Sequence, residues 1–159
     1  INLSYDWRLG PGEIFVRGNG TYFYKYAVQN YNGTWTSVVN QGLSQVGTEG
    51  GVIVRWRHTL TIGYTTPSWE LSVTQQYQEP YLDTPSTVTQ VPRHVSAYDT
   101  INTQASYTGL RHFDFTLGVI NLFNQNPPYA NYASIDQQFR RWIRSHLVGI
   151  RAAATSMRR

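Results

Sequence analysis

Four residues have the types and spacing that acid–base or metal chemistry requires. His112 and Asp114 stand two apart in "RHFD", so on a strand both side chains would point to the same side. Together with His94 or Asp99 they could bind a divalent metal or activate a water, and one hypothesis, an alternative to the membrane interpretation below, is therefore a small soluble β-protein that hydrolyses esters or lactones. The alternative is that all four are polar residues of a barrel lining or rim. No Gly-x-Ser-x-Gly elbow and no phosphate-binding loop accompanies them.

Composition indicates strands as the elements that must position these residues. The 159 residues include 12 Tyr, 6 Phe and 5 Trp but no cysteine, which excludes disulfides and thiolate metal sites. Aromatic residues combined with many Thr, Ser, Gln and Val favour strands over helices. No apolar run approaches the roughly 18 residues of a membrane helix, whereas transmembrane β-strands are short and only half apolar. The first ten residues, "INLSYDWRLG", have no signal-peptide pattern.

The positive charge is concentrated at the C-terminal end. Residues 135–159 hold six arginines and one acid, a net +5, whereas residues 1–134 hold seven basic and eight acidic residues, a net −1. A nucleic-acid partner is therefore not expected. The segment "VRWRH" does not change this, because strand alternation places Arg55 and Arg57 on the face opposite Trp56. We expect these two arginines to face a pore beneath a lipid-facing tryptophan.

Apolar and polar residues alternate along six segments, which predicts an all-β fold, an antiparallel up-and-down meander of about six strands in three hairpins. The predicted strands are 1–9, 14–28, 52–64, 69–78, 96–108 and 112–123. Short turns at 10–13, 65–68 and 109–112 alternate with long loops at 30–51, 79–95 and after 123. This asymmetry, with Tyr and Trp near strand ends, is typical of part of an outer-membrane barrel. A soluble barrel or sandwich, or a binding module that uses the two long loops, is the alternative.

The last predicted strand leads into a motif with a family resemblance. The segment "GVINLFNQNPPY" closely resembles the C-terminal β-barrel region of TonB-dependent outer-membrane receptors, with Asn102 where that family often has Asp. The resemblance is most specific over 96–129 and looser over 1–134. The residues that match are Gly118, Val119, Asn121, Leu122, Phe123, Asn124, Pro127, Pro128 and Tyr129. We expect Gly118 to allow close packing, Asn121 to bond backbone at the strand exit, and the prolines to end the ladder.

The resemblance implies a function for the parent protein. Members are receptors that import siderophores, cobalamin or sugars through a barrel of about 22 strands closed by a plug. The parent would lie in the bacterial outer membrane, with lipid, the remaining strands, the plug and TonB as partners, no catalytic residues and no cofactor. Six strands leave two open edges, so we expect this segment to be a receptor fragment that does not transport alone and self-associates through those edges. The localisation of the segment by itself is not predicted.

The C-terminal residues 135–159 depart from the barrel pattern. Alternation stops, and apolar spacing predicts an amphipathic helix or a disordered tail; the apolar positions are Phe139, Trp142, Ile143, Leu147 and Ile150. A shifted reading frame is one explanation, because one codon choice for 141–147, read one base later, encodes Gly-Gly-Tyr-Asp-Pro-Thr. The last residues would then be vector-encoded. The alternative is a genuine basic helix that binds a membrane surface or a partner.

Overall fold

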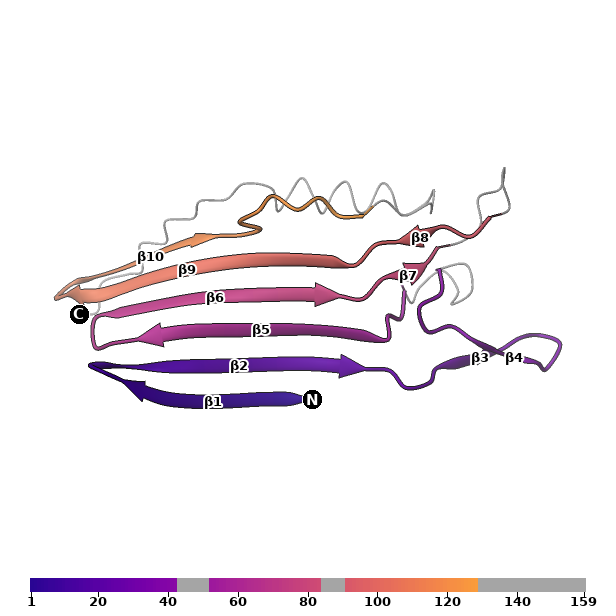
Figure 1. The fold of residues 1–159 in the computed structure, drawn as a ribbon, viewed down its shortest axis with the longest axis horizontal. Helices are drawn as coiled ribbons and strands as arrows, with labels where there is room; N and C mark the ends of the chain where they lie inside the picture. Colours follow the sequence, from indigo (N-terminus) through magenta and orange to yellow (C-terminus); the bar gives the residue numbers. More distant parts are fainter. Residues whose placement is uncertain (43–51, 84–90, 129–159) are drawn as a thin grey trace.

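A computed structural model describes residues 1–42, 52–83 and 91–128 of the chain, and their regular structure consists of β-strands. Six strands form one antiparallel sheet in the order β1-β2-β5-β6-β9-β10, which confirms the predicted meander (Figure 1). These strands are β1 (Asn2–Leu9), β2 (Gly12–Tyr22), β5 (Trp56–Thr65), β6 (Trp69–Gln78), β9 (Tyr98–Leu110) and β10 (Phe113–Val119).

Three short turns join the strands pairwise at one end of the sheet, on the left in Figure 1. Between β1 and β2, Gly10 adopts a φ of 59°, a left-handed conformation that glycine accepts without steric cost. Between β5 and β6, the Thr66 N–H donates to the Trp69 carbonyl at 2.7 Å, and the Trp69 N–H donates to the Thr66 hydroxyl at 3.0 Å. We call this end of the sheet the turn end.

Two small hairpins lie at the opposite end, which we call the loop end. They pair β3 (Ala27–Gln29) with β4 (Trp35–Ser37), and β7 (Tyr81–Leu82) with β8 (His94–Val95). The strand predicted at 14–28 therefore stops at Tyr22, and the segments predicted as loops at 30–51 and 79–95 contain short strands. The local turn explains the first difference. Asn30 bonds Thr34 through the backbone at 2.8 Å, and Gly33 supplies a φ of 81°, so a tight hairpin replaces the extended strand.

Tight burial among the described apolar side chains is confined to the loop end. The buried ones are Val38, Val39, Val54 and Val95. Asn40 links this small core to the main sheet: its Oδ1 accepts the Arg55 N–H at 2.7 Å, its Nδ2 donates to Glu79 Oε1 at 3.2 Å, and its carbonyl accepts the Leu82 N–H at 2.9 Å. The loop end is therefore a small folded unit with its own hydrogen bonds.

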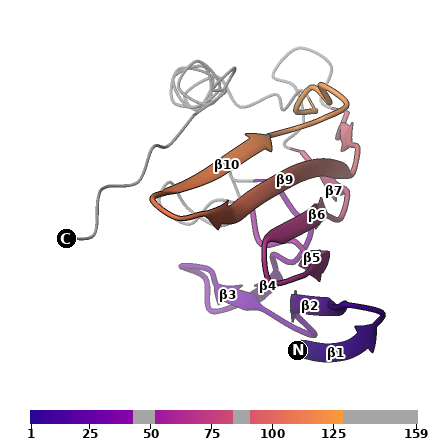
Figure 2. The same ribbon diagram turned by 90° about the vertical axis from the view of Figure 1, so that its left-hand side faces the viewer.

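The six-stranded sheet has no such cover among the described strands. Figure 2, viewed from the turn end, shows its strands following one another as a single twisted layer. Neither small hairpin packs against the strands of the main sheet. No helix with the length and hydropathy of a membrane span occurs in the described ranges. The tail at 135–159, the boundary proposed at 134 and Tyr129 lie outside the described residues.

Candidate functional site

One face of the six-stranded sheet is apolar across all its strands. Directly opposed residues of antiparallel strands project to the same side, so the register defines this face. Its central row consists of Tyr5, Val16, Ile62, Val73, Thr103 and Val119. Much of it is open to the surroundings: Tyr5 is 61% exposed, Ile62 49%, Val73 47% and Leu117 57%. Contiguous exposed apolar surface on this scale marks contact with a protein partner or a membrane.

Aromatic rings border this apolar face at both ends. The turn-end band consists of Trp7, Tyr64, Trp69, Tyr107 and Phe115, and the loop-end band of Tyr22, Trp56, His58 and Tyr77. The rings contact one another across strands: the centroids of Trp69 and Tyr107 lie 4.5 Å apart, and those of His58 and Tyr77 lie 5.2 Å apart. Along β6, the eight-residue step from Trp69 to Tyr77 spans roughly 27 Å of extended strand.

Between the bands, the apolar face is hollowed along β9. Thr103 and Ala105 carry smaller side chains than their neighbours on β6 and β10, and a shallow hollow of about 330 Å³ lies over them. Its apolar lining comes from Ile62, Leu71, Val73, Ala105, Leu117 and Val119. The middle of this face is therefore a shallow, mainly aliphatic hollow without charged side chains.

Polar side chains enter the apolar face mainly beside the loop-end band. Gln75 Nε2 donates to Asp99 Oδ2 at 2.9 Å, and the Trp56 indole N–H donates to His58 Nδ1 at 2.9 Å. Each of these groups has a partner on its own face. The apolar surface therefore ends at this level, and the chain beyond it belongs to the loop end.

The opposite face is polar over most of its length, and its hydroxyl and amide groups pair across strands. The Thr61 and Thr74 hydroxyls lie 2.9 Å apart, and those of Ser106 and Thr116 lie 3.0 Å apart. Phe15 is the main apolar exception. Its ring covers Gly63 on the neighbouring strand, where a Cβ atom would collide with it and would lie 2.7 Å from the Leu71 carbonyl oxygen. Glycine at position 63 therefore leaves the space that the Phe15 ring and the β6 backbone occupy.

Two arginines on the polar face have different surroundings. Arg17 forms an ion pair with Asp6 at 2.5 Å, and its guanidinium carbon lies 5.5 Å from the centre of the Phe15 ring. Arg57 has no hydrogen bond or ion pair through its side chain with any other described residue. The charge of Arg17 is therefore neutralised within the sheet, whereas that of Arg57 is free to meet a solute.

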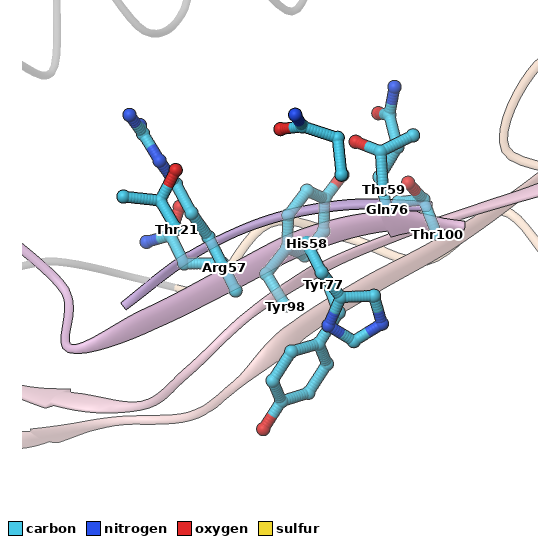
Figure 3. Close-up of a pocket in the computed structure, with 10 residues that line it drawn as sticks. Thr21, Arg57, His58, Thr59, Gln76, Tyr77, Tyr98 and Thr100 are labelled. Carbon is cyan, nitrogen blue, oxygen red and sulfur yellow. The ribbon is translucent and has the colours of Figure 1, made fainter. Parts of the chain in front are cut away.

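Arg57 lies in a polar hollow of about 380 Å³ that crosses four strands. Two complete cross-strand rows supply its polar side chains, which are Thr21, Arg57, Gln78 and Tyr98 in one row and Asn19, Thr59, Gln76 and Thr100 in the other. Figure 3 shows Thr21, Arg57, Thr59, Gln76 and Thr100 projecting from one side of the sheet, while the His58 and Tyr77 rings point to the other. We call these eight side chains the arginine trough.

Arg55, the other arginine predicted to face a pore, precedes β5. Its N–H bonds to the side chain of Asn40, and its carbonyl accepts the Phe23 N–H at 2.8 Å. The Arg55 backbone thus fixes the start of β5. Of the two arginines, Arg57 lies within the cross-strand rows of the arginine trough and Arg55 does not.

The residues of the family-like motif form the exit from β10. Asn121 has a φ of 54°, its Oδ1 accepts the Gln125 N–H at 2.8 Å, and its Nδ2 donates to the Gln125 carbonyl at 2.9 Å. Asn102, on β9, accepts the Asn121 N–H at 2.8 Å. The expected backbone bonding by Asn121 is therefore present. The described residues give no close packing at Gly118, because an added Cβ would meet only the Thr103 carbonyl oxygen at 3.4 Å, an ordinary contact.

The four residues considered for hydrolysis lie at opposite ends of the sheet. His94 and Asp99 belong to the loop end, whereas His112 and Asp114 belong to the turn end, beyond the 13 residues of β9. That strand spans roughly 40 Å, so the two pairs cannot act on one water or metal ion. No group of three or more His, Cys, Asp or Glu residues suited to a metal ion occurs in the described ranges.

One phenol of the loop end has a perturbed acidity. Burial raises the pKa of Tyr81 above its ordinary value, and the nearby negative charge of Asp83 raises it further. Tyr81 thus stays protonated at neutral pH.

Sequence reasoning identified Arg57 but not the other members of the arginine trough. The two-residue period of a strand indicates the face on which Thr59, Gln76, Gln78 and Thr100 lie but not their neighbours on the next strand. The rows depend on the register between strands, which alternation alone leaves open. The chain matches no family model, no curated protein and no solved structure.

Proposed function

We propose that this chain forms part of the wall of an outer-membrane-type β-barrel, with the apolar face against lipid and the polar face toward the lumen. The observation that carries the proposal is the apolar face bordered by the two aromatic bands. A tilt of about 40° reduces the roughly 27 Å between bands along β6 to about 20 Å along the membrane normal, close to the apolar band of such barrels. Trp and Tyr prefer the interfaces on either side of the hydrocarbon.

The polar face supports the same proposal. A sheet with one apolar and one hydrated face is what a barrel with a water-filled interior requires. The edges β1 and β10 have no neighbour among the described strands, so each presents backbone groups that must be paired before the sheet can enter lipid. Further strands, from the rest of a parent barrel, would supply those partners.

Among barrels of this kind, we propose a TonB-dependent receptor as the parent. The motif from Gly118 onward supports this, and the bonding of Asn121 gives that motif a structural role at the strand exit. The parent would import a scarce nutrient such as a siderophore, cobalamin or sugar across the bacterial outer membrane, with TonB and a plug as partners. The six-strand segment alone would not transport.

Depth-resolved tryptophan quenching tests the membrane proposal. The full chain is refolded with phosphatidylcholine vesicles that carry bromine either near the carbonyl level or deep in the acyl chains. Variants retain a single tryptophan at Trp7, Trp56, Trp69 or Trp35, the others being replaced by Phe. Trp35 is the matched control, because it is 68% exposed in β4, outside the main sheet.

We expect Trp7, Trp56 and Trp69 to be quenched most strongly by bromine near the carbonyl level, and Trp35 by neither lipid. Equal and weak quenching of all four tryptophans would contradict the proposal, as would a chain that stays monomeric and fully in the aqueous phase without detergent.

A further inference from the structure

We propose that the arginine trough is a binding site for a small hydroxylated carboxylate, of the sugar-acid class. This inference rests on the proposed function to the extent that the polar face lines a water-filled lumen. The trough combines one free cation with a dense set of neutral hydrogen-bonding groups, which is the pairing that such a solute requires. Neither the family-like motif nor the membrane face depends on these residues.

The charge of the trough favours an anionic ligand. Neither cross-strand row of the trough contains a carboxylate, and Arg57 is its one charged side chain. Asp99 and Glu79 follow trough residues in sequence, but Asp99 bonds Gln75 on the apolar face, and Glu79 accepts from Asn40. A planar guanidinium with five N–H donors binds a carboxylate through two parallel hydrogen bonds, so an anion is the ligand that Arg57 selects.

The neutral residues of the trough favour a ligand with hydroxyl groups. Thr59, Gln76 and Gln78 place hydroxyl and amide groups next to Arg57, and Thr100 contributes a side chain that is only 7% exposed. Each amide offers two donors and an acceptor, and each hydroxyl offers both functions, so they match the hydroxyl groups of a sugar ring. The hollow of about 380 Å³ falls within the range of small-ligand sites.

Arg17 lies on the same face as Arg57, but its side chain is bonded within the protein and is not available to a ligand. It is held by Asp6 at 2.5 Å and donates to the Tyr5 and Val16 carbonyls at 3.1 Å. Because its donors are occupied within the protein, Arg17 provides a matched control for removal of an arginine.

The test measures binding of D-glucuronate to the full chain in detergent micelles by calorimetry or saturation-transfer NMR. D-glucose carries the hydroxyl groups without the charge, acetate the charge without the hydroxyl groups, and inorganic phosphate a different anion. We expect glucuronate to bind more tightly than any of the other three. Arg57→Gln should weaken glucuronate binding about tenfold and Arg57→Lys about threefold, whereas Arg17→Gln should change it less than about twofold.

Three results would overturn the proposal: equal binding by the wild type and Arg57→Gln, glucose bound as well as glucuronate, or no glucuronate binding by a chain with intact strand circular dichroism. Arg57→Lys keeps the positive charge at the same position. If Arg57→Gln loses binding while Arg57→Lys retains most of it, the loss is due to the missing charge and not to misfolding. Vesicle flotation is scored on the same samples. A chain that floats without binding glucuronate fails this inference only, and one that binds without floating fails the membrane proposal only.

Discussion

The two faces of the main sheet use the same backbone and register but different side-chain chemistry. On β6, Val73 is 47% exposed on the apolar face, yet its neighbour Ser72 projects into the polar face. The apolar face contains aliphatic side chains between two bands of rings, and the polar face contains paired hydroxyls, the Arg17–Asp6 ion pair and the arginine trough. A soluble sandwich would bury the apolar face, and no second sheet among the described strands covers it.

Introducing an arginine on one face at a time is the strongest test of the difference between the two faces. Val73→Arg should prevent or severely weaken insertion into vesicles, because a charged side chain facing lipid near the bilayer centre costs about 2–4 kcal/mol. Ser72→Arg, one residue away on the polar face, should insert as the wild type does. Vesicle flotation and guanidinium unfolding in lipid measure both. Equal tolerance of the two arginines would remove the distinction between the faces.

Gly63 and Gly118 lie in one cross-strand row of the polar face. Gly63 is closely packed, whereas Gly118 is in a more open position. Gly63→Ala should destabilise the sheet by about 1–3 kcal/mol, because the new Cβ collides with the Phe15 ring and lies close to the Leu71 carbonyl. Gly118→Ala should change stability by less than about 0.5 kcal/mol, since its Cβ meets only an ordinary contact. Denaturant midpoints report both values, and a larger loss for Gly118→Ala would contradict the packing described for this row.

Double-mutant cycles compare side-chain pairs on the two faces. The Trp69–Tyr107 pair, with its centroids 4.5 Å apart, should give a coupling of about 0.5–1.5 kcal/mol. The Thr61–Thr74 pair on the polar face should give about 0.2–1 kcal/mol. Trp69→Leu with Tyr107→Leu and Thr61→Val with Thr74→Val supply the variants, and unfolding free energies supply the readout. A stronger coupling between the threonines would reverse the ranking of the faces.

A small, salt-dependent effect is expected at the Arg17–Asp6 ion pair. Both side chains are more than one-third exposed, so Asp6→Asn should lower stability by less than about 1 kcal/mol. Added salt should reduce this loss, because exposed charges are screened. Arg57→Gln is the control and should leave the salt dependence of stability unchanged. A salt-independent loss in Asp6→Asn would show that the carboxylate acts through packing or hydrogen bonding instead.

The sequence by itself determined the strand content and the two faces. Alternation such as Leu3, Tyr5 and Trp7 against Ser4, Asp6 and Arg8 fixes which side chains share a side, because the period of a strand is two residues. The segments "GPGE", "TTPS" and "GLRH" located the tight turns. Local chemistry was sufficient for these features.

Only the tertiary structure decided which strands' residues become neighbours. Register placed Arg57 beside Gln78 and Thr21, paired Arg17 with Asp6, and separated His94 and Asp99 from His112 and Asp114 by the length of β9. Such pairings arise from hydrogen bonds between segments far apart in the chain, and alternation within one strand carries no information about the offset of the next.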